Sequence, residues 1–378
     1  MIKVLYFMDG LGNAGGIQEM ALKWMKNIDH SKVQIDILSY NHVKPDNYSE
    51  RVNRLGGKVY VIESFQDKGM FWKSLKQTKD FFKVHSDYDI LHAHSSSKAF
   101  FVLLAAKVAG VKVRILHSHA TQFVITGKFP LFVAHILKWP AKWIATNYIA
   151  CSPEAGDFLF GKEERKKGNL FIAHNAIDTN VFKASDEVRK KIREEFGFND
   201  TTFVVGNVGR FRPQKNHQFL IKIFRAVIDL APTARMVCVG GGELEESIHL
   251  QAKKLGVYDK IVFTGIRNDV KDVMQAFDLL VMPSLFEGLP VTGVEAQAVG
   301  TPVLFADSIT IDAPILPSSD FYPLNASPEE WAKKVLSYKS KERVSNPEKW
   351  IKEKKYDIEL ESKRLEQLYM NLVNDKAN

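Results

Sequence analysis

FVVGNVGRFRPQKNHQFLIKIF, residues 203–224, contains a β-rich apolar run, a polar loop and an amphipathic helical pattern in direct succession. The same order recurs along the whole chain of 378 residues. Strands that alternate with helices indicate parallel sheets crossed by helices. We therefore predict an α/β protein, and the length of the chain favours two domains over one.

The predicted strands fall into two series. They are IKVLYF, VQIDILS, KVYVI, ILHAH, VRILHSH and NYIACS in the first half, and FVVGNVG, ARMVCVGG, KIVFTG, LLVMPS and PVLFA in the second. We predict two doubly wound, Rossmann-like domains, residues 1–175 and 176–354, joined within IAHNAIDTNVF (172–182). The last helix, about 355–378, is predicted to return to the first domain.

The composition narrows the range of possible ligands and cellular compartments but does not identify one function. The formal charge of +8 and the pI of about 9.1 predict a surface that attracts nucleotide phosphates, nucleic acid or acidic lipid. Cys151 and Cys238 lack CxxC spacing, which argues against a disulfide framework or a zinc site and favours a reducing compartment. No apolar run approaches the ~20 residues that span a bilayer. We expect a cytoplasmic protein, and no nucleic-acid module is recognisable.

The loop of the opening stretch carries two cations. Arg210 directly follows the predicted strand, and Lys215 lies at the start of the predicted helix. Two cations beside free helix N–H groups favour a diphosphate site. A solvated basic loop without a ligand is the alternative.

Glycine-rich loops follow three other predicted strands. DGLGNAGGIQEMALKW (9–24) could bring backbone N–H groups to a phosphate, although it matches neither the dinucleotide fingerprint nor a P-loop. VCVGGGELEE (237–246) and VFTGIRNDV (262–270) belong to the second half. Ligands of open parallel sheets bind beyond the carboxyl ends of the strands, so we expect the second-half loops to lie at one end of one sheet. Each loop could also be only a turn.

FEGLPVTGVE (286–295) follows the predicted strand LLVMPS. Pro290 suits the first turn of a helix, because its missing N–H would have no partner there. Glu287 and Glu295 then face the same space as the N–H groups around Leu289 and Val291. A carboxylate accepts two hydrogen bonds, which suits the paired hydroxyls of a sugar. The alternative is a surface glutamate and a glutamate favoured by the helix dipole.

These motifs together resemble the retaining glycosyltransferases of family 4, which have the GT-B fold of two domains facing across a cleft. The second-half motifs are GRFRPQKN (209–216), GGGELEE (240–246), FTGIRNDV (263–270) and the E-x7-E pattern EGLPVTGVE (287–295). The motifs that resemble the bacterial capsule and exopolysaccharide branch are GGIQE (15–19), HSHAT (117–121), CSPEAGDFLFG (151–161) and HNAIDTNVF (174–182). The resemblance covers nearly the whole chain.

The resemblance also implies residue roles. Arg210 and Lys215 would hold the donor diphosphate and stabilise the leaving group. Glu295 would bind the ribose hydroxyls, and Glu287 would lie near the transferred sugar. The backbone of Ile266 and Arg267 would contact the base, and Gly15 and Gly16 would contact the phosphates. His119 or, as second choice, His117 would contact the sugar. The remaining implied contacts with the nucleotide-sugar are made by Gly241, Leu289, Pro290 and Val291.

The implied reaction moves a sugar from a nucleotide-sugar, in this branch a UDP-sugar, to a lipid-linked or growing polysaccharide acceptor. Same-face attack would retain the anomeric configuration. Two rivals are a nucleotide-sugar epimerase of the same architecture and a non-catalytic nucleotide-sugar-binding protein. The resemblance implies no metal, although the clustered histidines make a metal site conceivable.

Two segments combine lysines with aromatic residues. They are FWKSLKQTKDFFK (71–83) and TGKFPLFVAHILKWPAKWIA (126–145). This composition suits helices that lie on an anionic membrane surface, and we expect the protein to be peripheral on the inner face of the cell membrane. Solvated charges and core tryptophans are the alternative.

Overall fold

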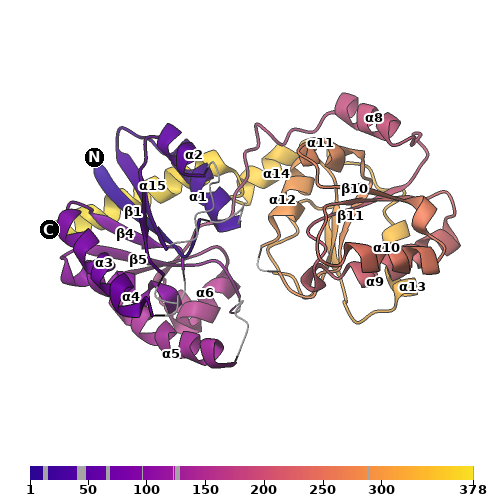
Figure 1. The fold of residues 1–378 in the computed structure, drawn as a ribbon. Helices are drawn as coiled ribbons and strands as arrows, with labels where there is room; N and C mark the ends of the chain where they lie inside the picture. The colour runs from indigo at the N-terminus through magenta and orange to yellow at the C-terminus, as the bar shows by residue number, and fades with distance from the viewer. Residues whose placement is uncertain are drawn as a thin grey trace. The chain divides into compact units, whose positions relative to one another are not determined.

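The computed structural model describes residues 1–11, 16–40, 48–64, 69–95, 97–121, 123, 128–287 and 289–377. The chain forms two compact units (Figure 1). Unit 1 consists of Met1–Asn175 and Ile358–Asn378, and unit 2 of Ala176–Asp357. The sequence had placed the boundaries at 175/176 and near 355.

Unit 1 is built on a seven-stranded parallel sheet in the order β3-β2-β1-β4-β5-β6-β7. Its strands are β1 (Ile2–Met8), β2 (Val33–Tyr40), β3 (Val59–Ile62), β4 (Ile90–Ala93), β5 (Val113–Ser118), β6 (Asn147–Ala150) and β7 (Leu170–Ile172). The helices α1 (Gly16–Asn27), α2 (Tyr48–Arg54) and α15 (Ile358–Ala377) cover one face. The other face carries α3 (Phe71–Val84), η1 (Ser97–Ala99), α4 (Phe100–Val108), α5 (Lys128–Ile144) and α6 (Pro153–Phe160), which α7 (Lys162–Lys166) follows.

Unit 2 contains a six-stranded parallel sheet in the order β10-β9-β8-β11-β12-β13. Its strands are β8 (Val204–Val208), β9 (Arg235–Val239), β10 (Ile261–Gly265), β11 (Leu279–Met282), β12 (Val303–Ala306) and β13 (Asp320–Tyr322). Its helices are α8 (Asp186–Glu195), η2 (Pro213–Lys215), α9 (His217–Leu230), α10 (Glu245–Lys254), η3 (Tyr258–Lys260), α11 (Val270–Val273), η4 (Met274–Ala276), α12 (Val291–Ala298), α13 (Pro328–Leu336) and α14 (Pro347–Glu353). The predicted fold class, two Rossmann-like parallel-sheet units, is confirmed.

Two strands of the structure were not predicted. β7 and β13 are three residues each, and both are edge strands of their sheets. Every residue of β7 is half-buried, and Asp320 of β13 is exposed. Short edge strands with mixed burial lack the apolar run that reveals a central strand.

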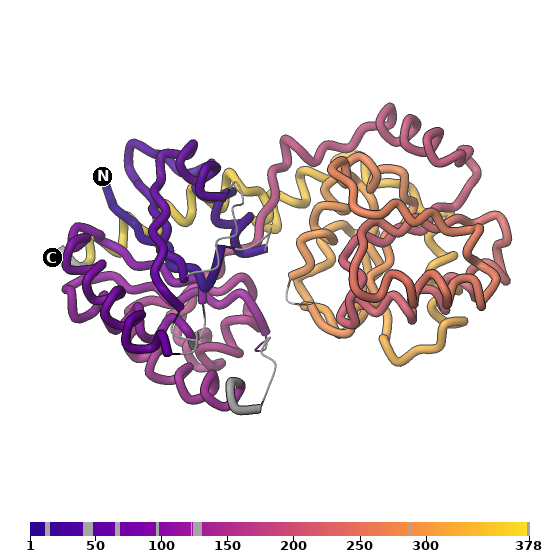
Figure 2. Tube along the Cα trace, in the orientation of Figure 1, coloured from indigo at the N-terminus to yellow at the C-terminus, as the bar shows by residue number. Residues whose placement is uncertain are grey.

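The C-terminal helix α15 packs on unit 1 against α1, β1 and β5, as predicted. Its buried Leu365 and Tyr369 face the sheet, and the Tyr369 hydroxyl lies 3.0 Å from the Tyr6 hydroxyl. Lys32 Nζ donates to Glu366 Oε1 at 2.9 Å. Figure 2 shows the yellow C-terminal tube among the indigo N-terminal segments. Buried apolar residues of α15, together with the polar contacts of Tyr369 and Glu366, therefore hold the end of the chain against its beginning.

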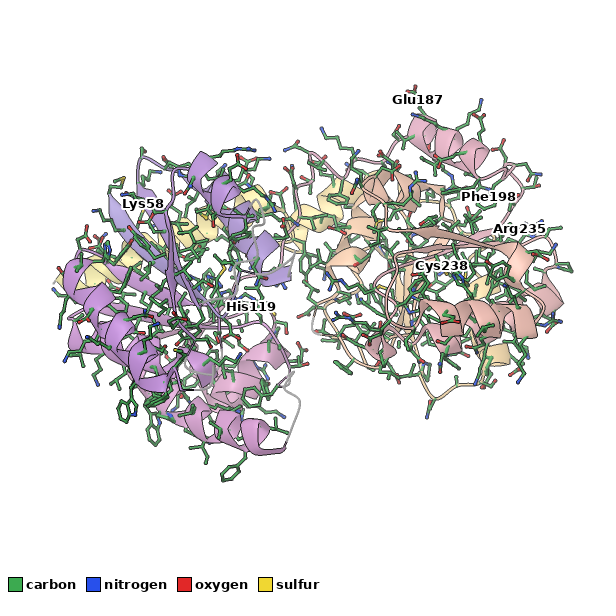
Figure 3. All side chains as sticks on the ribbon, viewed as in Figure 1. Lys58, His119, Glu187, Phe198, Arg235 and Cys238 are labelled. Carbon is green, nitrogen blue, oxygen red and sulfur yellow. The ribbon has the colours of Figure 1, made fainter. Side chains whose placement is uncertain are left out.

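The core of unit 2 depends on the absence of a side chain at one strand position. A Cβ atom at Gly206 of β8 would lie 2.0 Å from Cδ2 of the fully buried Phe277 ring. Both cysteines are free and buried, Cys151 in unit 1 and Cys238 in unit 2, where Figure 3 labels it. None of the helices in the described ranges is long and apolar enough to cross a bilayer.

Replacement of Gly206 by Ala is expected to lower the free energy of unfolding by about 1–3 kcal/mol, because the Phe277 ring must leave its packed position. Chemical denaturation measures this change. Gly10→Ala is the matched control, since a Cβ atom at Gly10 would meet nothing within 4 Å. Equal stability of the two variants would contradict the packing argument.

Candidate functional site

The four second-half loops singled out in the sequence lie at one edge of the unit 2 sheet. β10, β9, β8 and β11 are consecutive neighbours in that sheet and run parallel. The loops that leave their carboxyl ends therefore emerge together, as predicted. This edge is where open α/β sheets bind their ligands.

The loops after β8 and β9 are joined backbone to backbone. Gly209 N–H donates to Val239 O at 2.9 Å, and Phe211 N–H donates to Gly241 O at 3.0 Å. A Cβ atom at Gly240 would lie 2.1 Å from Gly209 O. Glycine is thus required for the approach of the two loops, and the predicted site residue Gly241 takes part as an acceptor.

Arg210 projects from this joined pair of loops. Its side chain is exposed, and among the described residues no hydrogen bond or ion pair involves its guanidinium group. Phe211, the next residue, is buried against the ring of His217 at a centroid distance of 4.4 Å. Burial, followed by the charge of Lys215, lowers the pKa of His217 to about 4. The loop therefore anchors one side chain in the core and leaves a guanidinium group available to an anion.

Lys215 ends the short helix η2 and is paired with Glu287. Lys215 Nζ donates to Glu287 Oε1 at 2.5 Å, and Ser284 Oγ donates to the same oxygen at 3.0 Å. The side chains of Lys215 and Glu287 are 19% and 10% exposed. Two predicted site residues from distant segments are therefore in direct contact, and an incoming diphosphate would meet a lysine that already has a carboxylate partner.

Backbone contacts fix the two segments that carry this ion pair. Leu285 N–H donates to Gln214 O at 2.8 Å, and Gln214 Nε2 donates to Phe286 O at 2.9 Å. Asn216 has a left-handed φ of 56° and donates from Nδ2 to Pro283 O. Sequence reasoning missed Gln214, Asn216 and Ser284 as supports of the site. Asparagine between a proline turn and an apolar helix was the available signal, since Asn tolerates this conformation.

α12 begins one residue later than the sequence indicated. Pro290 is its N-cap, with φ −75° and ψ 96°, and Val291 is the first helical residue. The first helical N–H groups have no acceptor within their own helix. Among the described residues none accepts from the N–H of Leu289 or Val291, so both remain available to a ligand. Glu295 is half-buried one turn further along.

Ile266 and Arg267 follow β10, next to the glycine loop. Gly240 N–H donates to Gly265 O at 2.9 Å, which ties this third loop to the second. The Ile266 side chain is 87% exposed. Arg267 donates to Glu195 Oε1 at 2.8 Å and to Asp269 Oδ2 at 2.5 Å, and the hydrogen bond to Asp269 raises the pKa of Arg267. With the Arg267 side chain engaged, the backbone is the part of this loop that can meet a ligand.

The glycine loop of unit 1 is only partly described. Gly15 lies outside the described residues. Gly16 is the first residue of α1, and a Cβ atom there would meet nothing within 4 Å. Gln18 Nε2 donates to Gly10 O at 2.7 Å across the start of the helix.

Four histidines gather at the carboxyl edge of the unit 1 sheet. His92 lies on β4, and His94 lies just after it; His117 lies on β5, and His119, labelled in Figure 3, lies just after that strand. The first three are buried and His119 is half-buried. Burial lowers the pKa of His119 to about 3, so its ring is neutral at physiological pH. A neutral half-exposed ring can exchange hydrogen bonds with a sugar.

Three of the same histidines have the spacing of a metal-binding cluster. His92, His94 and His117 each offer a ring nitrogen, and these atoms lie within 4.8 Å of one another. His92 Nε2 and His117 Nδ1, however, are already hydrogen-bonded at 3.0 Å, and the Tyr369 hydroxyl lies 2.7 Å from His92 Nδ1. Hydrogen bonds therefore account for both nitrogens of His92, which fits a ring network better than a metal centre.

The helices α3, α4 and α5 present exposed apolar side chains. On α5 the exposed residues form a stripe at helical spacing, which we call the α5 stripe: Phe132, Ile136, Trp139 and Trp143. Trp72 of α3 and Val108 of α4 are 77% and 75% exposed. The tryptophans of the α5 stripe are therefore surface residues and not core.

Lys138 and Lys142 of α5 do not lie beside this stripe, contrary to expectation. Lys142 donates to Phe160 O at 2.6 Å and pairs with Glu164 at 3.0 Å, and Lys138 donates to Phe158 O. These contacts turn both lysines toward α6 and α7, because carbonyl groups at the end of α6 need donors. Lys76 and Lys79 of α3 are exposed, and within the described parts of the chain no ion pair involves them.

Comparisons with known proteins agree with this architecture. Residues 14–181 match the family model "Glycosyltransferase Family 4", and residues 188–356 match "Glycosyl transferases group 1". The chain is 32% identical to EpsF of Bacillus subtilis (strain 168), named as a glycosyltransferase, over 82% of this chain and 80% of EpsF. It is 25% identical to the UDP-Gal:alpha-D-GlcNAc-diphosphoundecaprenol alpha-1,3-galactosyltransferase of Escherichia coli, over 77% and 76%.

Solved structures share the fold across the full chain. Alr3699/HepE of Anabaena, crystallised in complex with UDP, superposes with a TM-score of 0.73 at 18% identity, covering 100% of this chain and 98% of that one. A glycosyltransferase from Rickettsia africae ESF-5 gives a TM-score of 0.76 at 14% identity, covering 98% of each chain.

Replacement of Lys215 by Met is expected to weaken the binding of pyrophosphate about tenfold or more, since a charged hydrogen bond contributes ~1.5–3 kcal/mol. Lys222→Met, which removes an exposed lysine of α9, is the matched control. Glu287→Gln should bind pyrophosphate at least as tightly as the wild type, because it frees Lys215 from its carboxylate. Isothermal titration calorimetry measures all three. Equally weakened pyrophosphate binding in K215M and K222M would contradict a specific contact between Lys215 and the diphosphate.

Proposed function

The chain belongs to the glycosyltransferases whose family 4 and group 1 models match its two halves, and from this membership we propose that it is a retaining enzyme that transfers a sugar from a UDP-sugar to a lipid-linked or growing polysaccharide acceptor. As a glycosyltransferase it is neither of the two rivals, the epimerase and the non-catalytic binding protein. The sugar donor, the acceptor and the stereochemistry of the transfer are the parts of this function that we propose.

The observation that carries the proposal is the convergence of positive groups at one edge of the unit 2 sheet. The guanidinium group of Arg210, which has no partner among the described residues, and the ammonium group of Lys215 both come from the loop after β8. The N–H groups at the start of α12, for which no described residue is an acceptor, come from the loop after β11. Each favours a phosphate oxygen. We propose that they bind the donor diphosphate and neutralise it without a metal.

The proposed chemistry follows from that charge. The bond between the anomeric carbon and the phosphate oxygen breaks, and its electron pair goes to the diphosphate. Preorganised cations stabilise this developing charge and should lower the barrier most. The acceptor hydroxyl attacks the anomeric carbon on the face the phosphate leaves and passes its proton to the phosphate oxygen. Glu287 is hydrogen-bonded to Lys215 and Ser284, which favours this path over a carboxylate nucleophile.

The remaining contacts of the donor are proposed from the family resemblance. Glu295 binds the ribose hydroxyls, the backbone at Ile266 and Arg267 meets the base, and His119 meets the transferred sugar. Gly15 and Gly16 are proposed to approach the phosphates. UDP is favoured because HepE binds it and the Escherichia coli relative uses UDP-Gal.

A two-stage assay tests the proposal. UDP-, GDP-, ADP- and dTDP-sugars are first screened for thermal stabilisation and slow nucleotide release, and a UDP-sugar is expected to respond. That donor is then incubated with a short-chain GlcNAc-diphospholipid, and NMR of the product reads the new anomeric configuration. An α-linked product from an α-linked donor is expected. A β-linked product would contradict retention, and a response confined to another nucleotide would contradict the choice of UDP.

We also propose that the exposed side of α3, α4 and α5 binds an anionic membrane surface, where a lipid-linked acceptor would be found. The α5 stripe supplies aromatic and aliphatic side chains that can enter the headgroup region. Lys76 and Lys79, on a helix that contacts α4, supply positive charge. We assign this charge to α3, since Lys138 and Lys142 of α5 are engaged with α6 and α7.

Cosedimentation with phosphatidylglycerol vesicles is expected for the wild type, to weaken as salt rises, and to be weak with phosphatidylcholine vesicles. Trp139→Ala combined with Trp143→Ala should lower vesicle binding about tenfold or more, because two interfacial anchors are lost. Leu250→Ala, which removes an exposed leucine from unit 2, is the control. Unchanged binding by the tryptophan variant would overturn the proposed surface.

A further inference from the structure

The four histidines of unit 1 form two hydrogen-bonded pairs. His92 Nε2 lies 3.0 Å from His117 Nδ1, and His94 Nδ1 lies 3.0 Å from His119 Nε2. The pairs lie against each other, with ring centroids 4.1 Å apart for His92 and His94 and 3.9 Å apart for His117 and His119. We call these four residues the histidine array.

Side chains from three other elements enclose the histidine array. Tyr6 of β1 contacts the rings of His92 and His94 edge-on, and Trp24 of α1 stacks near His94 and His117. Tyr369 of α15 is hydrogen-bonded to His92. Among the described residues, the titratable groups that face the array are the two tyrosine hydroxyls, and burial raises the pKa of both, so neither supplies a charge.

Each ring of the array is neutral. Burial lowers the pKa of His92, His94 and His117, and the neighbouring histidines lower it further; burial alone lowers that of His119 to about 3. A neutral imidazole carries one N–H group and one bare nitrogen. In the pair His94–His119 there are therefore two N–H groups, and the bond between the rings uses one.

The second N–H group has two available positions. It can lie on His94 Nε2, which is buried and has no hydrogen-bond partner among the described residues, or on His119 Nδ1, on a half-exposed ring. A buried donor without an acceptor loses its hydrogen bond to water without replacement, and orphaned N–H groups are rarer in proteins than under-used acceptors. The hydrogen-bond count thus favours the arrangement in which His94 keeps a bare Nε2.

We propose that His94 donates its Nδ1–H to His119 Nε2 and thereby holds His119 in the tautomer that presents Nδ1–H outward as a hydrogen-bond donor. His94 is then a positioning residue. The tautomer is assigned from contacts within unit 1 alone. That the Nδ1–H group of His119 binds an oxygen of the transferred sugar rests on the function proposed above.

This tautomer limits what His119 can do. Its outward nitrogen can donate to a sugar hydroxyl or ring oxygen, but it has no lone pair with which to take a proton from the acceptor. His119 would therefore orient the sugar and would not act as a general base. The proton of the attacking hydroxyl is left to the departing phosphate, which agrees with the proposed same-face route.

The direct test is NMR of the full chain with 15N-labelled imidazole rings, without any ligand, between about pH 6 and pH 8. The 11 histidines give separate ring signals, and His119→Gln identifies that of His119 by its loss. We expect a neutral His119 with a protonated Nδ1 and a bare Nε2 throughout this range. A protonated Nε2, a ring that titrates within the range, or stoichiometric Zn²⁺ binding that shifts the signals of His92, His94 and His117 would overturn the inference.

Two substitutions of His94 separate positioning from packing. His94→Asn retains an N–H donor near the place of Nδ1, whereas His94→Asp offers only acceptors and should force His119 to donate from Nε2. We expect H94D to raise KM for the donor sugar about tenfold or more, to raise the pKa of His119, and to protonate Nε2. H94N should recover most of this loss and keep Nδ1–H.

The outcomes remain distinguishable from failure of the proposed function. Thermal unfolding and UDP binding, which depends on unit 2, serve as folding controls for both variants. If the wild type transfers no sugar, the proposed function fails while the ring NMR still decides the tautomer. If the wild type is active and H94D matches it in KM and in the tautomer of His119, His94 does not position His119 and the inference is wrong.

Discussion

The close approach of two backbone loops in unit 2 is the constraint on which the proposed donor site depends. In the loops after β8 and β9, Phe211 N–H donates to Gly241 O and Leu244 N–H donates to Phe211 O, and Gly240 leaves no room for a Cβ atom against Gly209. Because hydrogen bonds fix the backbone of both loops, the Arg210 side chain projects without a partner among the described residues, while Phe211 after it remains in the core. Rigid support of this kind lets a charge act on a ligand without reorganisation.

The two units prepare polar groups in opposite ways. Unit 2 keeps its cations charged near solvent and holds Lys215 against Glu287, so the lysine is positioned before a diphosphate arrives. Unit 1 buries three imidazole rings and half-buries that of His119, and burial lowers the pKa of all four, so their proposed role depends on the direction of their hydrogen bonds. Leaving-group stabilisation needs charge, whereas recognition of a sugar oxygen needs a donor of fixed orientation.

Sequence reasoning located the loops more reliably than the side-chain contacts within them. The position of Arg210 after a strand and the start of α12 near Pro290 followed from local pattern, with an error of one residue at the helix start. The contact of Lys215 with Glu287 joins segments 72 residues apart, and no spacing rule predicts it. Lys138 and Lys142 were expected to face outward beside Trp139, yet α6 carbonyl groups draw them inward. The direction of a long side chain on a surface helix depends on which element packs beside it, and the sequence does not state that.

The sequence by itself determined the alternation of strands and helices, the two-unit division, the return of the last helix and the chemical type of each loop. These features depend on local periodicity and on residues such as glycine and proline with characteristic backbone preferences. Only the tertiary structure decided the partners: which carboxylate meets Lys215, that Tyr369 from the end of the chain reaches His92, and that His94 and His119 share one hydrogen bond. Such pairings depend on distances between segments remote in sequence, and packing of the whole core sets those distances.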